Sequence, residues 1–171
     1  METKTKYQPT GKKVLLFSGG MDSLMMDYFI NPDILLYIPS KSSYEEIETK
    51  KLHELTDSGY VDKDKLVIFE DTLNLKRFER DDYIVPNRNA FYLLLASMIG
   101  ETLILGSVSG DRSNDKDEIF FSKINDLMDY MWQEQHWTEG RKFNVISPYK
   151  DTTKTELVKK LKPILLITVN L

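Results

Sequence analysis

The fold of this chain is decided by the stretch Val14-Leu15-Leu16-Phe17-Ser18-Gly19-Gly20-Met21-Asp22-Ser23. Its first four residues are all apolar, which is typical of a strand buried on both faces of a sheet. Two glycines then end the run, and the pattern from Asp22 to Ile30 predicts a short helix that stops at Asn31-Pro32. A strand, a tight turn and a helix in direct succession indicate the opening unit of a parallel α/β sheet.

The same alternation of strand and helix continues along the chain. Apolar, β-branched runs predict further strands at residues 34–38, 66–69, 103–105, 144–146 and 164–167. Helical patterns lie between and after them, at about 43–57, 87–99, 118–137 and 153–161. Ser43 and Glu46 stand at the spacing of a capping box at the start of the first of these helices. We therefore expect one domain over residues 1–171, an α/β protein with a doubly wound parallel sheet.

The composition narrows the classes of function. The chain has no cysteine, which excludes disulfides, thiol chemistry and cysteine-bound zinc, and its two histidines are too few for a histidine-rich metal site. A formal net charge of −4 provides no global positive field, which argues against a nucleic acid as partner. The start of the chain is polar, and no apolar run is long enough to span a bilayer. We expect a cytoplasmic protein with no membrane partner.

The loop from Ser18 to Ser23 has the chemistry of an anion site. Its glycines allow backbone N–H groups to approach a ligand closely, and the following helix adds unpaired N–H groups and the positive end of its dipole. The two serines add hydroxyl donors. This set suits a pyrophosphate and differs from a Walker A loop, because no Lys-Ser or Lys-Thr pair ends it. The alternative is a plain strand-to-helix turn capped by a serine or aspartate.

The string Ser-Gly-Gly-Met-Asp-Ser resembles the PP-loop of the N-type ATP pyrophosphatases. The resemblance implies an adenine nucleotide alpha-hydrolase-like fold of the HUP or Rossmann-like kind. It also implies that the protein uses ATP and Mg²⁺, adenylates an oxygen of its acceptor and releases pyrophosphate. The residues that it places on the nucleotide are Ser18, Gly19, Gly20, Met21, Asp22, Ser23 and Ile38.

Three later segments are similar to the 7-cyano-7-deazaguanine synthases, which make the nitrile precursor of queuosine. Residues 85–91 resemble the Pro-x-Arg-Asn-x-x-Phe motif of that family, with a phenylalanine one place early. Residues 106–111 resemble its Gly-x-x-x-x-Asp loop, and residues 147–156 resemble its late Pro…Lys-x-Glu segment. The resemblance implies that Arg88, Asp111 and Lys154 are catalytic and that Asp22 and Asp111 bind Mg²⁺.

Each of these residues also has an interpretation that needs no family. Arg88 is a permanent cation near a helix start and suits a phosphate, or it pairs with the nearby acidic run at the surface. Asp111 is a hard oxygen ligand for Mg²⁺, or a turn-forming aspartate after Gly110. Lys154 neutralises a pyrophosphate, or is an exposed helix lysine.

The chain departs from the deazaguanine family in two ways. It lacks the terminal cysteine cluster, so we expect no zinc. Residues 38–43 also replace the Tyr-Gly-Gln signature after the second strand. Our leading hypothesis is ATP-dependent adenylation of a carboxylated deazapurine, followed by ammonia-dependent formation of an amide and then a nitrile. The alternatives are a PP-loop enzyme with another small-molecule or tRNA acceptor, and a degenerate nucleotide-binding module without turnover.

The predicted helix at 118–137 is rich in aromatic residues, which are Phe120, Phe121, Tyr130, Trp132 and Trp137. Such rings would stack on a purine-like base. Their helical spacing more often indicates core or a dimer interface, so a homodimer stays among the partners that the sequence allows.

Overall fold

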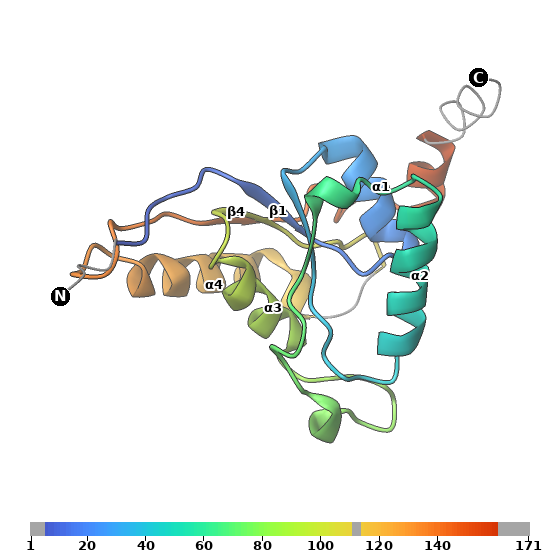
Figure 1. Cartoon of the computed structure of the whole chain (residues 1–171), viewed down its shortest axis with the longest axis horizontal. Helices are drawn as coiled ribbons and strands as arrows, with labels where there is room; N and C mark the ends of the chain where they lie inside the picture. The colour runs from blue at the N-terminus through green and yellow to red at the C-terminus, as the bar shows by residue number, and fades with distance from the viewer. Residues whose placement is uncertain (1–5, 111–113, 161–171) are drawn as a thin grey trace.

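The computed structural model describes residues 6–110 and 114–160. They form one five-stranded sheet, and every strand pairs in parallel, in the order β3-β2-β1-β4-β5 (Figure 1). The strands are β1 (Lys13–Leu16), β2 (Ile34–Tyr37), β3 (Leu66–Ile68), β4 (Thr102–Ile104) and β5 (Asn144–Ile146). The α/β class and the parallel sheet that the sequence predicts are confirmed.

The strand β1 lies at the centre of the sheet, and its residues 14–16 are buried on both faces. Leu15 is fully buried and lies in register with Leu35 of β2 and Ile104 of β4. Parallel strands that are covered on both faces are expected to be continuously apolar, as residues 14–16 of β1 and the whole of β2 are.

Helices cover both faces of this sheet. The α-helices are α1 (Met21–Ile30), α2 (Glu45–Asp57), α3 (Arg88–Ala96) and α4 (Glu118–Met131), and residues 154–160 are also helical. Met25 of α1 and Leu52 of α2 pack on one face, against the side chains of Leu15 and Leu35. Leu93 of α3 and Met128 of α4 pack on the other face, and Figure 1 shows these two helices together beneath β1 and β4. This two-sided arrangement agrees with a doubly wound sheet.

The remaining regular elements are single turns of 3₁₀-helix, namely η1 (Lys63–Lys65), η2 (Lys76–Phe78) and η3 (Asn114–Lys116). Within residues 6–110 and 114–160, no helix is long and apolar enough to cross a membrane.

The predicted capping box at α2 is wrong. The helix begins at Glu45 after Tyr44, and no side chain caps it. Ser43 instead donates its backbone N–H and its hydroxyl to the carboxylate of Glu79, with the hydroxyl at 2.8 Å. The hydrogen bonds of Ser43 therefore go to a carboxylate in the irregular segment between β3 and α3, and not to the first turn of α2 as the local spacing predicts.

The long aromatic helix also ends earlier than predicted. The α-helix α4 stops at Met131, and Trp132 and Phe121 are buried in the core, as the core interpretation predicts. Tyr130 is 71% exposed, so the aromatic residues do not form a single stacking platform. The chain then turns back, because the N–H of Tyr7 donates to the carbonyl of Trp137 and the N–H of Arg141 donates to that of Trp132. The predicted strand at 164–167 lies outside the described residues.

A buried ion pair lies at the amino-terminal ends of β4 and β5. Arg141 is 3% exposed, lies over the rings of Trp132 and Phe143, and donates from Nε to Glu101 at 2.7 Å. Thr10 donates to the same carboxylate from its backbone and its hydroxyl. Burial alone would raise the pKa of Glu101, but the hydrogen bonds from Thr10 and Arg141 outweigh it, so this pKa lies below its usual value.

Removing one partner of this pair tests its role. We expect Glu101→Ala to lower the free energy of unfolding by about 3 kcal/mol, because it leaves the guanidinium buried and uncompensated. The control is Asp57→Ala, which breaks an exposed pair with Lys63 and should cost less than about 1 kcal/mol. Urea denaturation measures both, and similar losses would show that the buried pair contributes no more than a surface pair.

Candidate functional site

A cavity of about 230 Å³ lies at the carboxyl ends of β1, β2 and β4. The chain leaves β1 towards β2 on one side, and leaves β4 towards β5 on the other. The carboxyl ends of strands at such a reversal form a crevice in which ligands of open α/β sheets bind. Among its lining residues are six that the sequence had singled out, Ser18, Gly20, Asp22, Ser23, Ile38 and Arg88.

The loop between β1 and α1 has one glycine that the backbone requires. Gly19 is buried and has a φ of +72°, a left-handed conformation that costs other residues energy. Gly20 has an ordinary φ of −71° and is the N-cap residue of α1. An added Cβ at Gly20 would meet only the Ser18 hydroxyl oxygen, at 3.3 Å. The strict conformational need is therefore at Gly19, while Gly20 is open towards the cavity.

The two serines hold the loop together. The N–H of Gly20 donates to the hydroxyl oxygen of Ser18 at 3.4 Å, and the Ser23 hydroxyl donates to the carbonyl of Gly20 at 2.9 Å. Ser23 is buried, and its only hydroxyl proton is donated to this carbonyl within the loop. The sequence prediction made it a donor to the ligand. In this structure, the donors that helix geometry leaves for a ligand are the backbone N–H groups of the first turn of α1.

Asp22 is the lining residue of this cavity with a fully buried side-chain oxygen that has no hydrogen-bond partner. Its Oδ2 forms an ion pair with Lys154 Nζ at 3.0 Å, while its Oδ1 is buried and has no hydrogen-bond partner. A buried oxygen without a partner is costly, so this atom favours a cation or a donor that arrives with a ligand. Lys154, which the sequence predicted to face the phosphates, is thus brought to the loop from the far end of the chain.

The start of α3 forms the opposite wall. Arg88 is the first residue of this helix and follows Asn87, whose φ of +62° turns the chain into it. Asn89 is buried and donates to Asp115 at 2.8 Å, which ties α3 to the segment before α4. Asp111, the other predicted Mg²⁺ ligand, lies outside the described residues.

Four lining residues were missed at the level of sequence: Tyr37, Glu48, Tyr92 and Lys116. The hydroxyl of Tyr37 donates to Glu48 at 3.4 Å. Burial raises the pKa of Glu48, and the positive charge of Arg88 partly offsets this. Burial also raises the pKa of Tyr37 to about 12. Glu48 stands in a charged run with Glu45 and Glu46, so nothing local marks it as facing a cavity.

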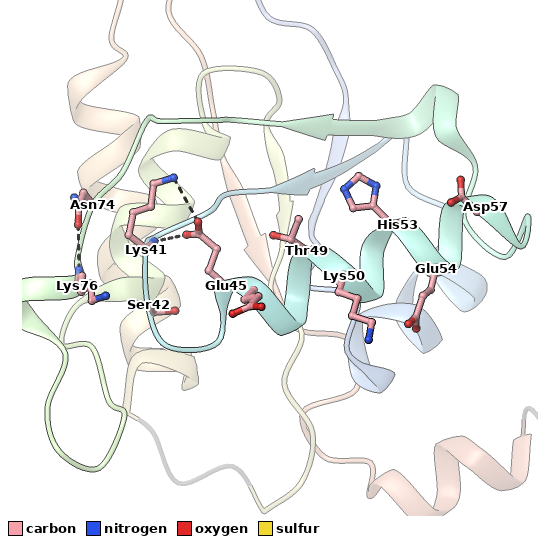
Figure 2. A pocket seen from close by; sticks show the side chains of 11 residues that line it. Lys41, Ser42, Glu45, Thr49, Lys50, His53, Glu54, Asp57, Asn74 and Lys76 are labelled. Carbon is pink, nitrogen blue, oxygen red and sulfur yellow. Dashed lines mark hydrogen bonds and ion pairs between the residues drawn. The ribbon is translucent and has the colours of Figure 1, made fainter.

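A larger hollow of about 970 Å³ runs along the outer side of α2 (Figure 2). Several of its charged side chains form exposed ion pairs, as Lys41 does with Glu45, which also lines the hollow, and with Asp71, which does not. Across the described residues, the buried side-chain atoms without a partner are Asp22 Oδ1 and Arg141 Nη1, and neither lines this hollow. The candidate site is therefore the smaller cavity.

The fit to a metal ion can be judged from Asp22. Within the described part of the chain, no group of three or more His, Asp or Glu side chains gathers as a metal site. Mg²⁺ needs no such cage, because it commonly binds through one or two carboxylates, waters and substrate phosphates. The unpartnered oxygen of Asp22, in the first turn of α1, fits that mode.

Comparison with known proteins does not assign the chain to a family. The chain matches no protein-family model and no curated protein. The resemblance to the PP-loop enzymes therefore rests on the motifs and on the geometry described above.

The two glycines of the loop should respond differently to substitution. We expect Gly19→Ala to cost about 1–2 kcal/mol of stability, because the left-handed backbone is strained for alanine. Gly20→Ala, at an extended N-cap position, should cost less than about 1 kcal/mol. Urea denaturation of both variants measures the difference, and an equal loss would contradict the backbone conformation of the loop.

Proposed function

We propose that this protein is a PP-loop ATP pyrophosphatase with an adenine nucleotide alpha-hydrolase-like fold, which adenylates a carboxylate on a small deazapurine-like acceptor. The observation that carries the proposal is the half-satisfied carboxylate of Asp22. It lies at the start of α1, beside a left-handed glycine turn, with Lys154 on one oxygen and nothing on the other. An anion-binding turn that also holds a cation-seeking oxygen suits a metal-bound pyrophosphate.

The position of the loop supports cleavage between the α- and β-phosphates. The first-turn N–H groups of α1 and the ammonium of Lys154 would hold the two terminal phosphates as the leaving group. The α-phosphate would then lie deeper in the cavity, towards Arg88. The guanidinium there would stabilise the charge that develops on the α-phosphate oxygens in the transition state.

The reaction balances as two transfers. A carboxylate oxygen of the acceptor attacks the α-phosphorus, the bond to the β-phosphate oxygen breaks, and pyrophosphate leaves with its charge on the loop. Ammonia then attacks the acyl carbon, AMP departs with the shared oxygen, and one proton is lost to give an amide. A second adenylation, now on the amide oxygen, followed by loss of AMP and protons, would yield a nitrile. Mg²⁺, held by Asp22, would supply neutralising charge to the phosphate oxygens.

The choice of acceptor comes from the resemblance of residues 85–91, 106–111 and 147–156 to the deazaguanine enzymes. Arg88 and Asn89 support it in part, because both occupy the wall that faces the loop. The direct test is to incubate the protein with ATP, Mg²⁺, ammonia and 7-carboxy-7-deazaguanine. We expect AMP and pyrophosphate in equal amounts and an amide or nitrile by mass spectrometry.

Each other outcome of this test has a defined meaning. Pyrophosphate release only with a different carboxylate or a tRNA would keep the adenylation and replace the acceptor. ATP binding with no pyrophosphate release for any acceptor would indicate a nucleotide-binding module without turnover. Absence of ATP binding would defeat the proposal as a whole.

The charges around Asp22 should matter for turnover. We expect Asp22→Asn to lower the rate of pyrophosphate release by about 10²-fold or more, since the neutral amide binds Mg²⁺ poorly and loses the ion pair with Lys154. Lys154→Met should slow the same step, while Lys159→Met, an exposed lysine on the same helix, should not. Equal rates for both lysine variants would remove Lys154 from the machinery.

A further inference from the structure

The cavity contains a second carboxylate that the binding of phosphates does not use. Of its described lining residues, Asp22 and Glu48 are the acidic ones. Asp22 belongs to the phosphate loop after β1, whereas Glu48 projects from α2 and contacts Tyr37 at the end of β2. Glu48 therefore reaches the cavity from the side of β2, and Asp22 reaches it from the loop after β1.

The hydrogen bonding of Glu48 is incomplete. Within the described residues, the one hydrogen bond to its carboxylate is the 3.4 Å contact from Tyr37, which is long for an O–H donor. The same tyrosine hydroxyl lies 3.4 Å from the hydroxyl of Thr49, and either of these two groups can be the donor of that contact. Arg88 acts on Glu48 through its charge. The carboxylate therefore keeps acceptor capacity on the side of the cavity.

Charge restricts what can occupy this side. A phosphate oxygen close to Glu48 would be repelled by the negative charge of the carboxylate, so the phosphates belong on the loop. The part of the ligand that reaches Glu48 has to be neutral and has to donate hydrogen bonds. The rings of Tyr37 and Tyr92 also line this part of the cavity and offer apolar surface beside the carboxylate.

We propose that Glu48, flanked by Tyr37 and Tyr92, is a specificity subsite for a neutral group with two adjacent hydrogen-bond donors. The inference rests on the proposed function, because the loop must hold the phosphates of the same ligand set. Two sources provide this chemistry. One is the ribose diol of ATP, and the other is the neighbouring N–H groups on the edge of the acceptor heterocycle. Both present donors to the two oxygens of one carboxylate.

The experiment compares Glu48→Gln with Glu46→Gln, an exposed glutamate on the same helix that does not line the cavity. Calorimetric titrations use pyrophosphate with Mg²⁺, ATP, 2′-deoxy-ATP, 3′-deoxy-ATP and 7-carboxy-7-deazaguanine. We expect Glu48→Gln to weaken binding of ATP or of the heterocycle about tenfold, as for one lost charge-assisted hydrogen bond, and to leave pyrophosphate affinity unchanged. Glu46→Gln should change none of these affinities.

The titrations with different ligands distinguish the ribose diol of ATP from the N–H groups of the acceptor heterocycle. A loss for ATP that shrinks with either deoxy nucleotide assigns the subsite to the ribose, and a loss confined to the heterocycle assigns it to the acceptor. Unchanged affinities for all ligands, or an equal loss for pyrophosphate, would overturn the subsite. Glu48→Asp, which keeps the charge and draws the carboxylate back from the cavity, provides a second variant if Glu48→Gln folds poorly, and it should weaken the same affinities while pyrophosphate binding stays unchanged.

Failure of the subsite and failure of the proposed function give different results. A Glu48-dependent loss of ATP binding in a protein that releases no pyrophosphate would support the subsite and defeat the enzymatic proposal. Pyrophosphate release at the same rate in the wild type and in Glu48→Gln, with unchanged affinities, would support the enzymatic proposal and overturn the subsite. A protein that binds pyrophosphate but neither ATP nor the heterocycle would overturn the subsite and leave the loop as an anion site.

Discussion

The rest of the structure depends on the burial of residues 14–16 of β1 on both faces of the sheet. Its residues Val14 and Leu15 are 0% exposed, so the strand has to lie between two neighbours and beneath helices on both faces. That position puts β2 on one side and β4 on the other, and it points the loop after β1 into the gap where the connections diverge. The loop that we propose as an anion site is thus located by a hydrophobic constraint rather than by its own chemistry.

The same constraint decides which helices meet at the site. Because α1 and α2 pack on one face and α3 and α4 on the other, Glu48 of α2 and Arg88 of α3 reach the cavity from opposite sides of the sheet. The helix at 154–160 packs on the α1 face through the buried Leu157, which brings Lys154 to Asp22. A site built from both faces is held by two separate packed layers, which favours a fixed geometry over adjustment.

The electrostatics of the cavity divide it into two parts. The loop side combines helix N–H groups, Lys154 and an unpartnered carboxylate oxygen, an arrangement that suits the anion and metal ion that we propose there. The β2 side presents Glu48 beside tyrosine hydroxyls with raised pKa values, which stay protonated at neutral pH and act as neutral donors or acceptors. The division agrees with a ligand that is charged at one end and neutral at the other.

The sequence by itself determined the five strands that the structure describes, the parallel class of the sheet, and the glycine turn between β1 and α1. These follow from local physics, because apolar runs, glycines and helix starts leave a mark within a few residues. The capping assignment of Ser43 failed because Glu79, distant in sequence, bonds it more directly. Only the tertiary structure decided that Gly19 rather than Gly20 carries the backbone requirement, that Lys154 pairs with Asp22, and that Glu48 faces the cavity. The physical reason is that each of these depends on contacts between elements far apart in the chain, and helical spacing alone does not distinguish a carboxylate that faces a cavity from one that faces water.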